Sequence, residues 1–414
     1  MPDAFISLHL NDSNAFLFDR EHHQTNRFSI MGAAYQVVGE EELALSLNNL
    51  RESVEDDSVE LPFDFRPGLV GSYSYEGVAT FMLVDRAIVL DHDGEHIYFL
   101  GLFDSEEAFI RYRDAALLRL ALIGGEGAVF RSKNKIKEIS SITLRHSDDE
   151  YIALIERAKE SIAKGDAYQL CLTNQMTIET ESHPFAAFLA LRENNPSPYL
   201  SLMRFGDISI VSSSPEQFLR VDESGLVSSK PIKGTRKRSL DAQEDLRLVE
   251  ELRTNEKERA ENLMIVDLMR NDLGRVSEPS DVVVAKLFDV ESYATVHQLV
   301  STVEAKLKQG LDVFDAIEAC FPAGSMTGAP KIRAMEILRG LEQGPRGIYS
   351  GCFGYISYRG AADLAMTIRT IVFEDGKATI GIGGGITIDS DPQAELFETK
   401  LKARALLSAL GVSQ

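Results

Sequence analysis

The chain has 414 residues, which is enough for two or three average domains or for one large α/β body with a single site. Hydrophobic residues make up 44% of it and charged residues 26%, the composition of an ordinary globular protein. Its formal net charge of −21 at pH 7 argues against nucleic acid and against an anionic membrane surface as partners.

Cysteine usage and the N-terminal segment indicate the compartment. Cys171, Cys320 and Cys352 are odd in number and far apart, so they suggest neither a disulfide framework nor a zinc site. The first residues lack the basic segment and apolar core of a signal peptide. The apolar stretches are too short to span a membrane. We therefore expect a cytoplasmic protein.

The first third of the chain reads as mixed strands and helices. Strands are expected at 69–75 and 97–103, and a helix at 105–123. No constellation of titratable side chains appears in this part, so we interpret it as scaffold.

The middle of the chain begins with a capping box at 147–150, which starts a helix. Alternating apolar residues from Tyr168 predict a strand after it. Further strands are expected at 199–205, 208–213 and 217–221. One long, charge-rich helix is expected from about 241 to 271.

Strand patterns return at 282–287, 351–358, 364–373 and 377–382. The last helix begins near Asp391, an N-cap residue followed by Pro392, and ends near residue 410. Because the strands come in antiparallel-looking runs rather than in strict βαβ alternation, we expect an α+β fold with large sheets and helices packed outside.

Two pairs of glutamates, each three residues apart, are candidates for a metal site. Glu258 and Glu261 lie on the long helix, and Glu395 and Glu398 on the last one, so each pair projects from one helix face. Such pairs are usually solvated, but the second follows a glycine-rich run at 381–385 whose amides can face an anion. If the pairs converge, they form an all-oxygen site suited to Mg²⁺.

Two charged residues near the middle of the chain have more than one interpretation. Lys233 lies in a constrained segment at 231–235, so its charge must be solvated, paired or chemically used. On spacing alone, Glu216 fits an exposed turn better than an acid.

Arg369 and His297 also leave alternatives open. Arg369 lies inside the strand expected at 364–373, where its charge needs a partner that a ligand carboxylate can supply. His297 suits a core or capping role as well as a ligand contact. The glycines at 324–331 lack the spacing of a P-loop, so no nucleotide site is predicted there.

Four segments occur in the order found in chorismate-utilising enzymes, which the chain resembles from about residue 147 to 412. They are PIKGT at 231–235, ENLMIVDLMRND at 261–272, PAGSMTGAPK at 322–331 and DPQAELFETK at 391–400. The resemblance implies the fold of anthranilate synthase, with two large antiparallel sheets that sandwich the site and helices outside. Residues 1–146 would then be a family-variable region contributing to the sandwich, and 147–414 the chorismate-binding catalytic region.

Two positions indicate one branch of this family. A lysine at position 233 is typical of members that aminate chorismate at C4 on the way to p-aminobenzoate and folate, whereas anthranilate-forming members usually carry alanine. Gln169 stands where isochorismate- and salicylate-forming members carry a lysine that activates water. Since glutamine cannot activate water in this way, the resemblance implies amination at C4 to 4-amino-4-deoxychorismate.

The resemblance also implies catalytic roles. Lys233 would attack C2 of chorismate with displacement of the C4 hydroxyl, which Glu216 would protonate. Ammonia would then attack C4 and expel the lysine. The residues that would lie around the substrate are Gly234, Thr235, His297, Tyr349, Arg369, Gly383, Gly385 and Lys402.

The family's cofactor and partner follow from the same resemblance. Glu261 and Glu398 would hold Mg²⁺, with Glu258 and Glu395 near it directly or through water. Ammonia would come from a separate glutamine amidotransferase subunit, because the chain shows no glutaminase Cys-His-Glu set. The alternatives are an anthranilate-type enzyme that aminates C2, and a non-catalytic subunit that only recruits the amidotransferase.

Overall fold

The computed structural model describes all residues except 22, 24, 25, 56, 57, 135, 137, 138, 140, 294, 295, 413 and 414. The α-helices are α1 (Pro2–His9), α2 (Leu43–Glu52), α3 (Glu106–Ala121), α4 (Glu126–Lys133), α5 (Asp148–Ala163), α6 (Pro184–Asn194), α7 (Ala242–Thr254), α8 (Glu256–Gly274), α9 (Val313–Cys320), α10 (Gly324–Thr327), α11 (Lys331–Glu342) and α12 (Pro392–Leu410).

The strands of the first half are β1 (Asn14–Asp19), β2 (Phe28–Ala33), β3 (Gln36–Val38), β4 (Gly68–Tyr73), β5 (Ala79–Val84), β6 (Arg86–Asp91), β7 (His96–Gly101), β8 (Thr143–Leu144), β9 (Gln169–Glu179), β10 (Tyr199–Phe205) and β11 (Ile208–Ser214). Those of the second half are β12 (Gln217–Val221), β13 (Leu226–Ser229), β14 (Ile232–Lys237), β15 (Val283–Ser292), β16 (Val296–Lys306), β17 (Gly328–Ala329), β18 (Cys352–Ser357), β19 (Ala362–Met366), β20 (Thr370–Glu374) and β21 (Lys377–Ile386).

Within the described residues these strands form two antiparallel sheets, of eleven and ten strands, so the predicted α+β fold with large sheets is confirmed. Sheet A has the order β17-β9-β21-β20-β11-β10-β1-β2-β6-β7, with β8 beside β9. Sheet B has the order β14-β16-β13-β12-β19-β18-β4-β5-β3, with β15 beside β16. Strands from the first 101 residues therefore form one end of each sheet.

The space between the two sheets is filled by a core of large side chains. On β1, Phe16 and Phe18 pack into this core with Phe353 of β18, while Leu17 packs on the opposite face against the helical side. Such alternation follows from the two-residue period of a strand. Because both faces of β1 are apolar, the strand must be covered on both sides, as it is here.

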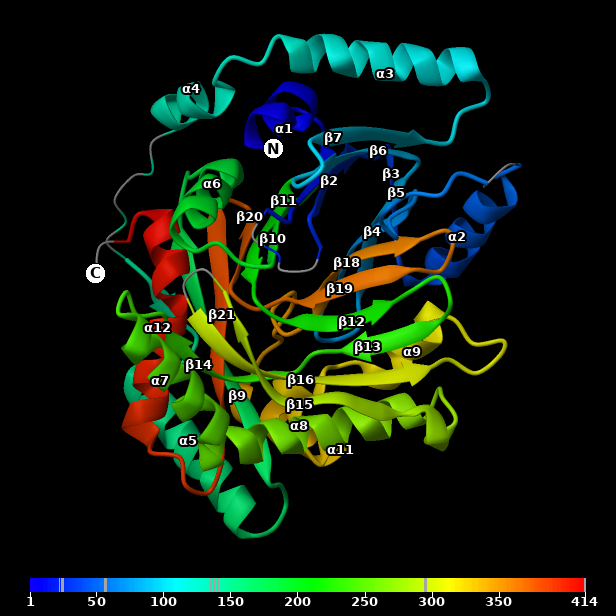
Figure 1. Ribbon diagram of the computed structural model, residues 1–414. Coiled ribbons are helices and arrows are strands. Elements are labelled where there is room, and N and C mark those ends of the chain that lie inside the picture. The colour runs from blue at the N-terminus through cyan, green and yellow to red at the C-terminus, as the bar shows by residue number, and fades with distance from the viewer. Residues whose placement is uncertain are drawn as a thin grey trace.

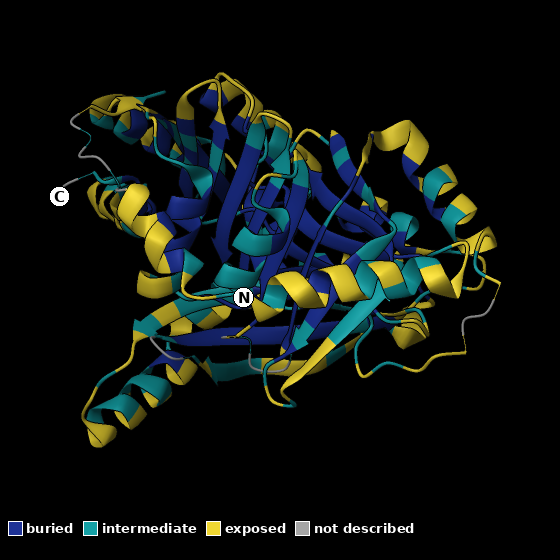
Figure 2. Ribbon diagram, turned by 90° about the horizontal axis from the view of Figure 1, so that it is seen from above, coloured by how far each residue is buried: buried dark blue, intermediate teal, exposed yellow. Residues whose placement is uncertain are grey.

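Helices cover the outer faces of the sheets (Figure 1). Helix α12 packs on β21 and on α6 and α5, and α8 packs on β16. Figure 2 shows the strands buried through the middle of the molecule, whereas α3 exposes much of its surface. Among the residues that the structure describes, no helix is long and apolar enough to cross a membrane.

The long helix predicted over 241–271 is wrong, because it consists of two helices. The break falls at Asn255, whose backbone is extended and whose side chain caps α8 by accepting a hydrogen bond of 3.0 Å from the Glu258 N–H. This cap starts a new helix, with Glu258 in its first turn and Glu261 in its second.

The strand predicted over 364–373 is wrong in the same way. Strand β19 ends at Met366 in sheet B, and β20 begins at Thr370 in sheet A. The three residues between them carry the chain from one sheet to the other. Arg369 has a φ of +52° there, so it lies in a crossing segment and not inside a strand.

Candidate active site

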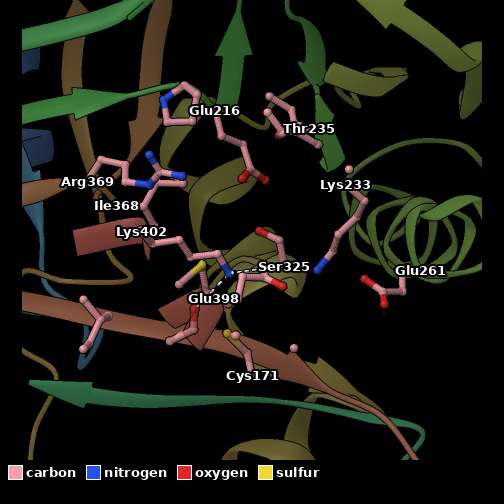
Figure 3. Close-up of a pocket in the computed structure, with 18 of the residues that line it drawn as sticks. Cys171, Glu216, Lys233, Thr235, Glu261, Ser325, Ile368, Arg369, Glu398 and Lys402 are labelled. Carbon is pink, nitrogen blue, oxygen red and sulfur yellow. Dashed lines mark hydrogen bonds and ion pairs between the residues drawn. The ribbon is translucent and has the colours of Figure 1, made fainter. Parts of the chain in front are cut away.

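A cavity of about 520 Å³ opens between the ends of the two sheets (Figure 3). Its walls come from β9 and β21 of sheet A, from β14 and β16 of sheet B, and from helices α8, α10 and α12. Cys171 is the first residue along the chain to line it, so the N-terminal part supplies no wall.

Two of the segments in which the chain crosses between the sheets bring charged side chains to this cavity. One leads from β11 to β12 and carries Glu216, and the other leads from β19 to β20 and carries Arg369. The crossings are bonded together, since the Met366 N–H donates to the Glu216 carbonyl at 3.0 Å. The topology of the two sheets therefore brings these two charged side chains to one place.

A bulge in β14 presents Lys233 to the cavity. The register against β16 shifts between Lys233 and Thr235, with Gly234 as the extra residue at φ +79°. A Cβ atom at position 234 would lie 2.9 Å from the carboxyl carbon of Glu258, so the close approach of α8 also requires glycine. In Figure 3 the Lys233 side chain points toward the same space as Glu216 and Glu261.

Glu216 is a buried carboxyl group, only 7% exposed. Burial raises its pKa to about 7, although the charge of Lys233 and hydrogen bonds from Ser325 and the Ile232 N–H act in the opposite direction. A carboxyl group with this pKa can give and take a proton near neutral pH.

The four glutamates lie on two walls of the cavity. Glu258 and Glu261 belong to α8, on sheet B, and Glu395 and Glu398 belong to α12, on sheet A. Each has a partner: Glu398 lies 2.9 Å from Lys402, Glu258 3.4 Å from Arg236, Glu261 3.8 Å from Lys257, and Glu395 accepts a hydrogen bond of 2.7 Å from Ser390.

The surroundings shift the pKa values of Glu261 and Glu398 in opposite directions. Burial raises the pKa of Glu261, and repulsion from Glu258 and Glu395 adds to the rise. Burial acts the same way on Glu398, but the charge and hydrogen bond of Lys402, with the charges of Lys257 and Lys233, together outweigh it and lower the pKa.

By the chemistry of their donors, these residues fit Mg²⁺. They supply only carboxylate oxygens, and a divalent cation would relieve the repulsion felt by Glu261. In the part of the chain that the structure describes, no three His, Cys, Asp or Glu side chains are gathered as a metal cluster. Metal binding by all four carboxylates would thus require them to leave these partners and draw together.

Further predicted contacts lie near Glu398, on the sheet A side of the cavity. Arg369 and Tyr349 line it together, and burial lowers the pKa of Arg369 and raises that of Tyr349. Lys402 donates a hydrogen bond of 3.1 Å to the Gly383 carbonyl, and Gly385 lies in the same wall. Cationic groups on this wall suit a ligand that carries carboxylates.

Of the predicted site residues, all except His297 line the cavity. Both His297 ring nitrogens are used on the other face of β16, with Ser292 at 2.7 Å and Asp245 at 3.0 Å. The neighbouring residue, Gln298, lines the cavity instead. Gln169, which stands where other members carry a water-activating lysine, is fully buried beside Gly385 and does not line the cavity.

Several lining residues were not predicted, among them Cys171, Arg236, Lys257, Gln298 and Ser325. Ser325 lies inside the motif at 322–331, which carried part of the family resemblance, but no residue of that motif was assigned to the site. Gln298 could have been found only by knowing which face of β16 looks inward.

A buried arginine holds the floor of the cavity together. Arg346 forms a bidentate pair with Glu342 at 2.7 and 2.9 Å, and donates to the carbonyls of Met326 and Cys171. Both carbonyls belong to cavity-lining residues on different elements, α10 and β9. Arg346 therefore fixes these two elements relative to each other.

Comparison with known proteins gives matches over nearly the whole chain. A model of the chorismate binding enzymes matches residues 34–408. An aminodeoxychorismate synthase of Streptomyces griseus is 45% identical over 381 residues, which are 88% of this chain and 53% of that protein. An anthranilate synthase component 1 of Acetivibrio thermocellus is 40% identical over 339 residues, 80% of this chain and 68% of that protein.

The solved structures agree in fold. Anthranilate synthase component I from Streptococcus pneumoniae TIGR4 superposes with a TM-score of 0.77 at 30% identity, over 96% of this chain and 90% of that one. The chain spans about half the length of the aminodeoxychorismate synthases that it matches, between 42% and 53%.

Proposed function

The chain belongs to the family of chorismate binding enzymes, and on this premise we propose that it aminates chorismate at C4 with ammonia to give 4-amino-4-deoxychorismate. The observation that carries the proposal is Lys233, an amine on the cavity wall within electrostatic reach of the buried acid Glu216. The names of relatives at 40–45% identity, aminodeoxychorismate synthases, support the same activity.

In the proposed first step, the Lys233 Nζ forms a bond to C2 of the ring. The ring double bonds shift toward C4, and the bond between C4 and its hydroxyl breaks. Glu216, protonated near neutral pH, donates its proton so that water leaves.

In the second step, ammonia forms a bond to C4, the double bonds shift back, and the Lys233 nitrogen leaves C2. The Glu216 carboxylate takes back a proton released from nitrogen, which restores the acid for the next turnover. The net change is the replacement of a hydroxyl group by an amino group, with release of water.

The remaining lining residues bind and orient the substrate in this proposal. Arg369 and Tyr349 hold the enolpyruvyl carboxylate, and Lys402 with the Gly383 and Gly385 backbone lies near the ring carboxylate. Glu261 and Glu398, with Glu258 and Glu395, would hold Mg²⁺, which supplies positive charge for the ring carboxylate when bound.

We assign the supply of ammonia to a glutamine amidotransferase partner. A glutaminase needs a reactive thiolate, and the cysteines of the described chain, Cys171, Cys320 and Cys352, are all buried. Burial raises the pKa of each of these thiols, which disfavours the thiolate. The chain with ammonium should therefore be active, and the chain with glutamine alone should not.

A product assay tests the proposal. Purified chain is incubated with chorismate, Mg²⁺ and ammonium at alkaline pH, and the product is treated with added aminodeoxychorismate lyase. Formation of p-aminobenzoate supports C4 amination. Fluorescent anthranilate with pyruvate release would contradict it and support the second candidate, C2 amination, which the similarity to anthranilate synthase component 1 favours.

A third possibility, a non-catalytic subunit, is distinguished from the proposed enzyme by its response to Mg²⁺. It predicts no Mg²⁺-dependent turnover at any ammonia concentration and no effect of Glu398→Gln. The proposed enzyme loses most of its turnover in that variant, because one of the carboxylates assigned to Mg²⁺ is gone.

A further inference from the structure

Gln298, on the wall of the candidate active-site cavity, has a buried side-chain oxygen without a hydrogen-bond partner. It is 5% exposed, it lines the cavity, and its Oε1 atom has no hydrogen-bond partner among the described residues. A buried polar atom that makes no hydrogen bond is unusual in a native structure and calls for an explanation.

The position of Gln298 in sheet B points the amide toward the reacting groups. On β16, His297 faces outward to Asp245 on the α7 side, so the next side chain faces inward. The cross-strand partner of Gln298 is Thr235, two residues beyond Lys233 across the bulge of β14. The amide therefore lies in the wall that presents the proposed nucleophile.

The fold gains no hydrogen bond from the Gln298 oxygen. Leaving a buried acceptor unpaired costs free energy, whereas an apolar side chain of the same size at that position would not. Gln217 offers the contrast, since it is also buried but donates to the Ser228 carbonyl at 3.0 Å and lies 3.3 Å from the Tyr199 hydroxyl. The Gln217 amide is thus paired within the fold, whereas the Gln298 oxygen is not.

We propose that Gln298 is a ligand-binding residue whose side-chain oxygen accepts a hydrogen bond from a neutral O–H or N–H donor at the reacting ring. Two groups in the proposed reaction can supply such a donor, the C4 hydroxyl of chorismate and the incoming ammonia. The inference rests on the proposed function for the identity of these two ligands, and on the unpaired amide for the residue.

The test uses the full chain with Gln298→Leu and, as a second variant of similar volume, Gln298→Met. Chorismate affinity is measured by calorimetry with Mg²⁺ present and ammonia absent, and the KM for ammonium is measured in the product assay. A five- to tenfold weaker chorismate Kd identifies the substrate hydroxyl as the donor. A five- to tenfold higher KM for ammonium with an unchanged chorismate Kd identifies ammonia.

Thermal stability separates ligand binding from a structural role. The Tm of Gln298→Leu should equal or exceed that of the parent, while Gln217→Leu, compared for stability alone, should be lower. A Gln298→Leu or Gln298→Met protein with both constants within twofold of the parent, or with a Tm loss like that of Gln217→Leu, would overturn the inference. If the parent binds chorismate but makes no C4-aminated product, the proposed function fails, and the calorimetric comparison still tests Gln298.

Discussion

At the scale of single residues, the site depends on an amine and an acid whose charges interact. Lys233 lies on an edge strand, and Glu216 lies in a crossing between sheets. The positive charge of Lys233 opposes the rise in the pKa of Glu216, yet burial dominates and leaves that pKa at about 7. The acid is therefore available in the range in which enzymes usually transfer protons.

Replacing Lys233 by alanine should remove the covalent route. We expect C4 amination by Lys233→Ala to fall at least about a hundredfold, because a positioned nucleophile is lost. Lys237→Ala, on the exposed end of the same strand, is the matched control and should stay within about twofold. Mass spectrometry of the parent with chorismate and no ammonia should find an adduct on Lys233, and a fully active Lys233→Ala protein would refute the assignment.

Glu216 should make stability depend on pH in a defined window. Its pKa is higher in the folded protein, about 7, than the ordinary value of 4.5, so its stabilising contribution is complete below pH 4.5 and is lost as pH rises through 7. The loss is about 3 kcal/mol. Urea denaturation should show Glu216→Gln lacking this loss and exceeding the parent in stability at pH 8. Parallel pH profiles for the two proteins would contradict it.

At the scale of elements, short caps and crossings set the site more than long periodic segments do. Asn255 caps α8 just before Glu258 and Glu261. The segment before Thr370 carries Arg369 from one sheet to the other. Both features lie in regions that the sequence pattern presents as continuous. A break and a crossing that periodicity does not mark thus help to position part of the site.

Removing the cap of α8 should weaken both the fold and metal binding. Asn255→Ala loses the hydrogen bond to the Glu258 N–H and should cost about 1 kcal/mol of unfolding free energy. Fraying of the first turn should also raise the Mg²⁺ Kd severalfold in calorimetry. Asn255→Ser keeps an acceptor and should restore most of both. An unchanged Mg²⁺ Kd in Asn255→Ala would show that the cap does not position Glu258 and Glu261.

Substitutions in the buried pair of Arg346 and Glu342 should have non-additive effects on the free energy of unfolding. Arg346→Met leaves the charge of Glu342 buried without its partner and should destabilise the chain by about 3–5 kcal/mol. The double variant Arg346→Met with Glu342→Leu should recover part of that loss, since no lone charge remains. Chemical denaturation of the four proteins of this cycle measures the coupling, and simple additivity would contradict it.

At the scale of the whole molecule, the two sheets are built by both parts of the chain. β1 lies beside β10 in sheet A, and β4 lies beside β18 in sheet B. β18 is buried along its whole length, and β10 along most of it. A fragment limited to the region that lines the cavity would thus leave each of these two apolar strands with one edge unpaired.

The fragment 147–414 should accordingly fail to fold on its own. Without β1 to β7, both sheets lose one end and the core between them loses Phe16 and Phe18. Expressed alone, the fragment should aggregate or show no cooperative unfolding by circular dichroism, while the full chain unfolds cooperatively. Co-expression with residues 1–146 should restore soluble protein. A fragment that is soluble and cooperative by itself would contradict this.

Much of this architecture could be read from the sequence, because it depends on local patterns. The capping box at Ser147 and the N-cap at Asp391 begin α5 and α12 as predicted, since a cap is a short-range hydrogen bond between neighbours in the chain. The α+β class follows from the same strand and helix periodicities.

The rest depends on contacts between distant residues. Apolar and charged positions continue through Asn255, so periodicity alone does not mark the break between α7 and α8. The β-branched residues on both sides of Arg369 read as one strand, because the change of sheet is decided by partners far away in sequence. The inward face of β16, which distinguishes Gln298 from His297, is likewise set only when β14 pairs with it.

The two crossings that carry Glu216 and Arg369 also have a mechanical consequence. Because both link the sheets covalently beside the cavity and are bonded to each other, they hold the two sheets together at that point. We expect any movement of one sheet over the other to be smallest at these crossings and larger at α8 and α12, which pack on different sheets. The distance between the glutamate pair on α8 and the pair on α12 would therefore report such a movement. A cation bound between the two pairs would oppose it.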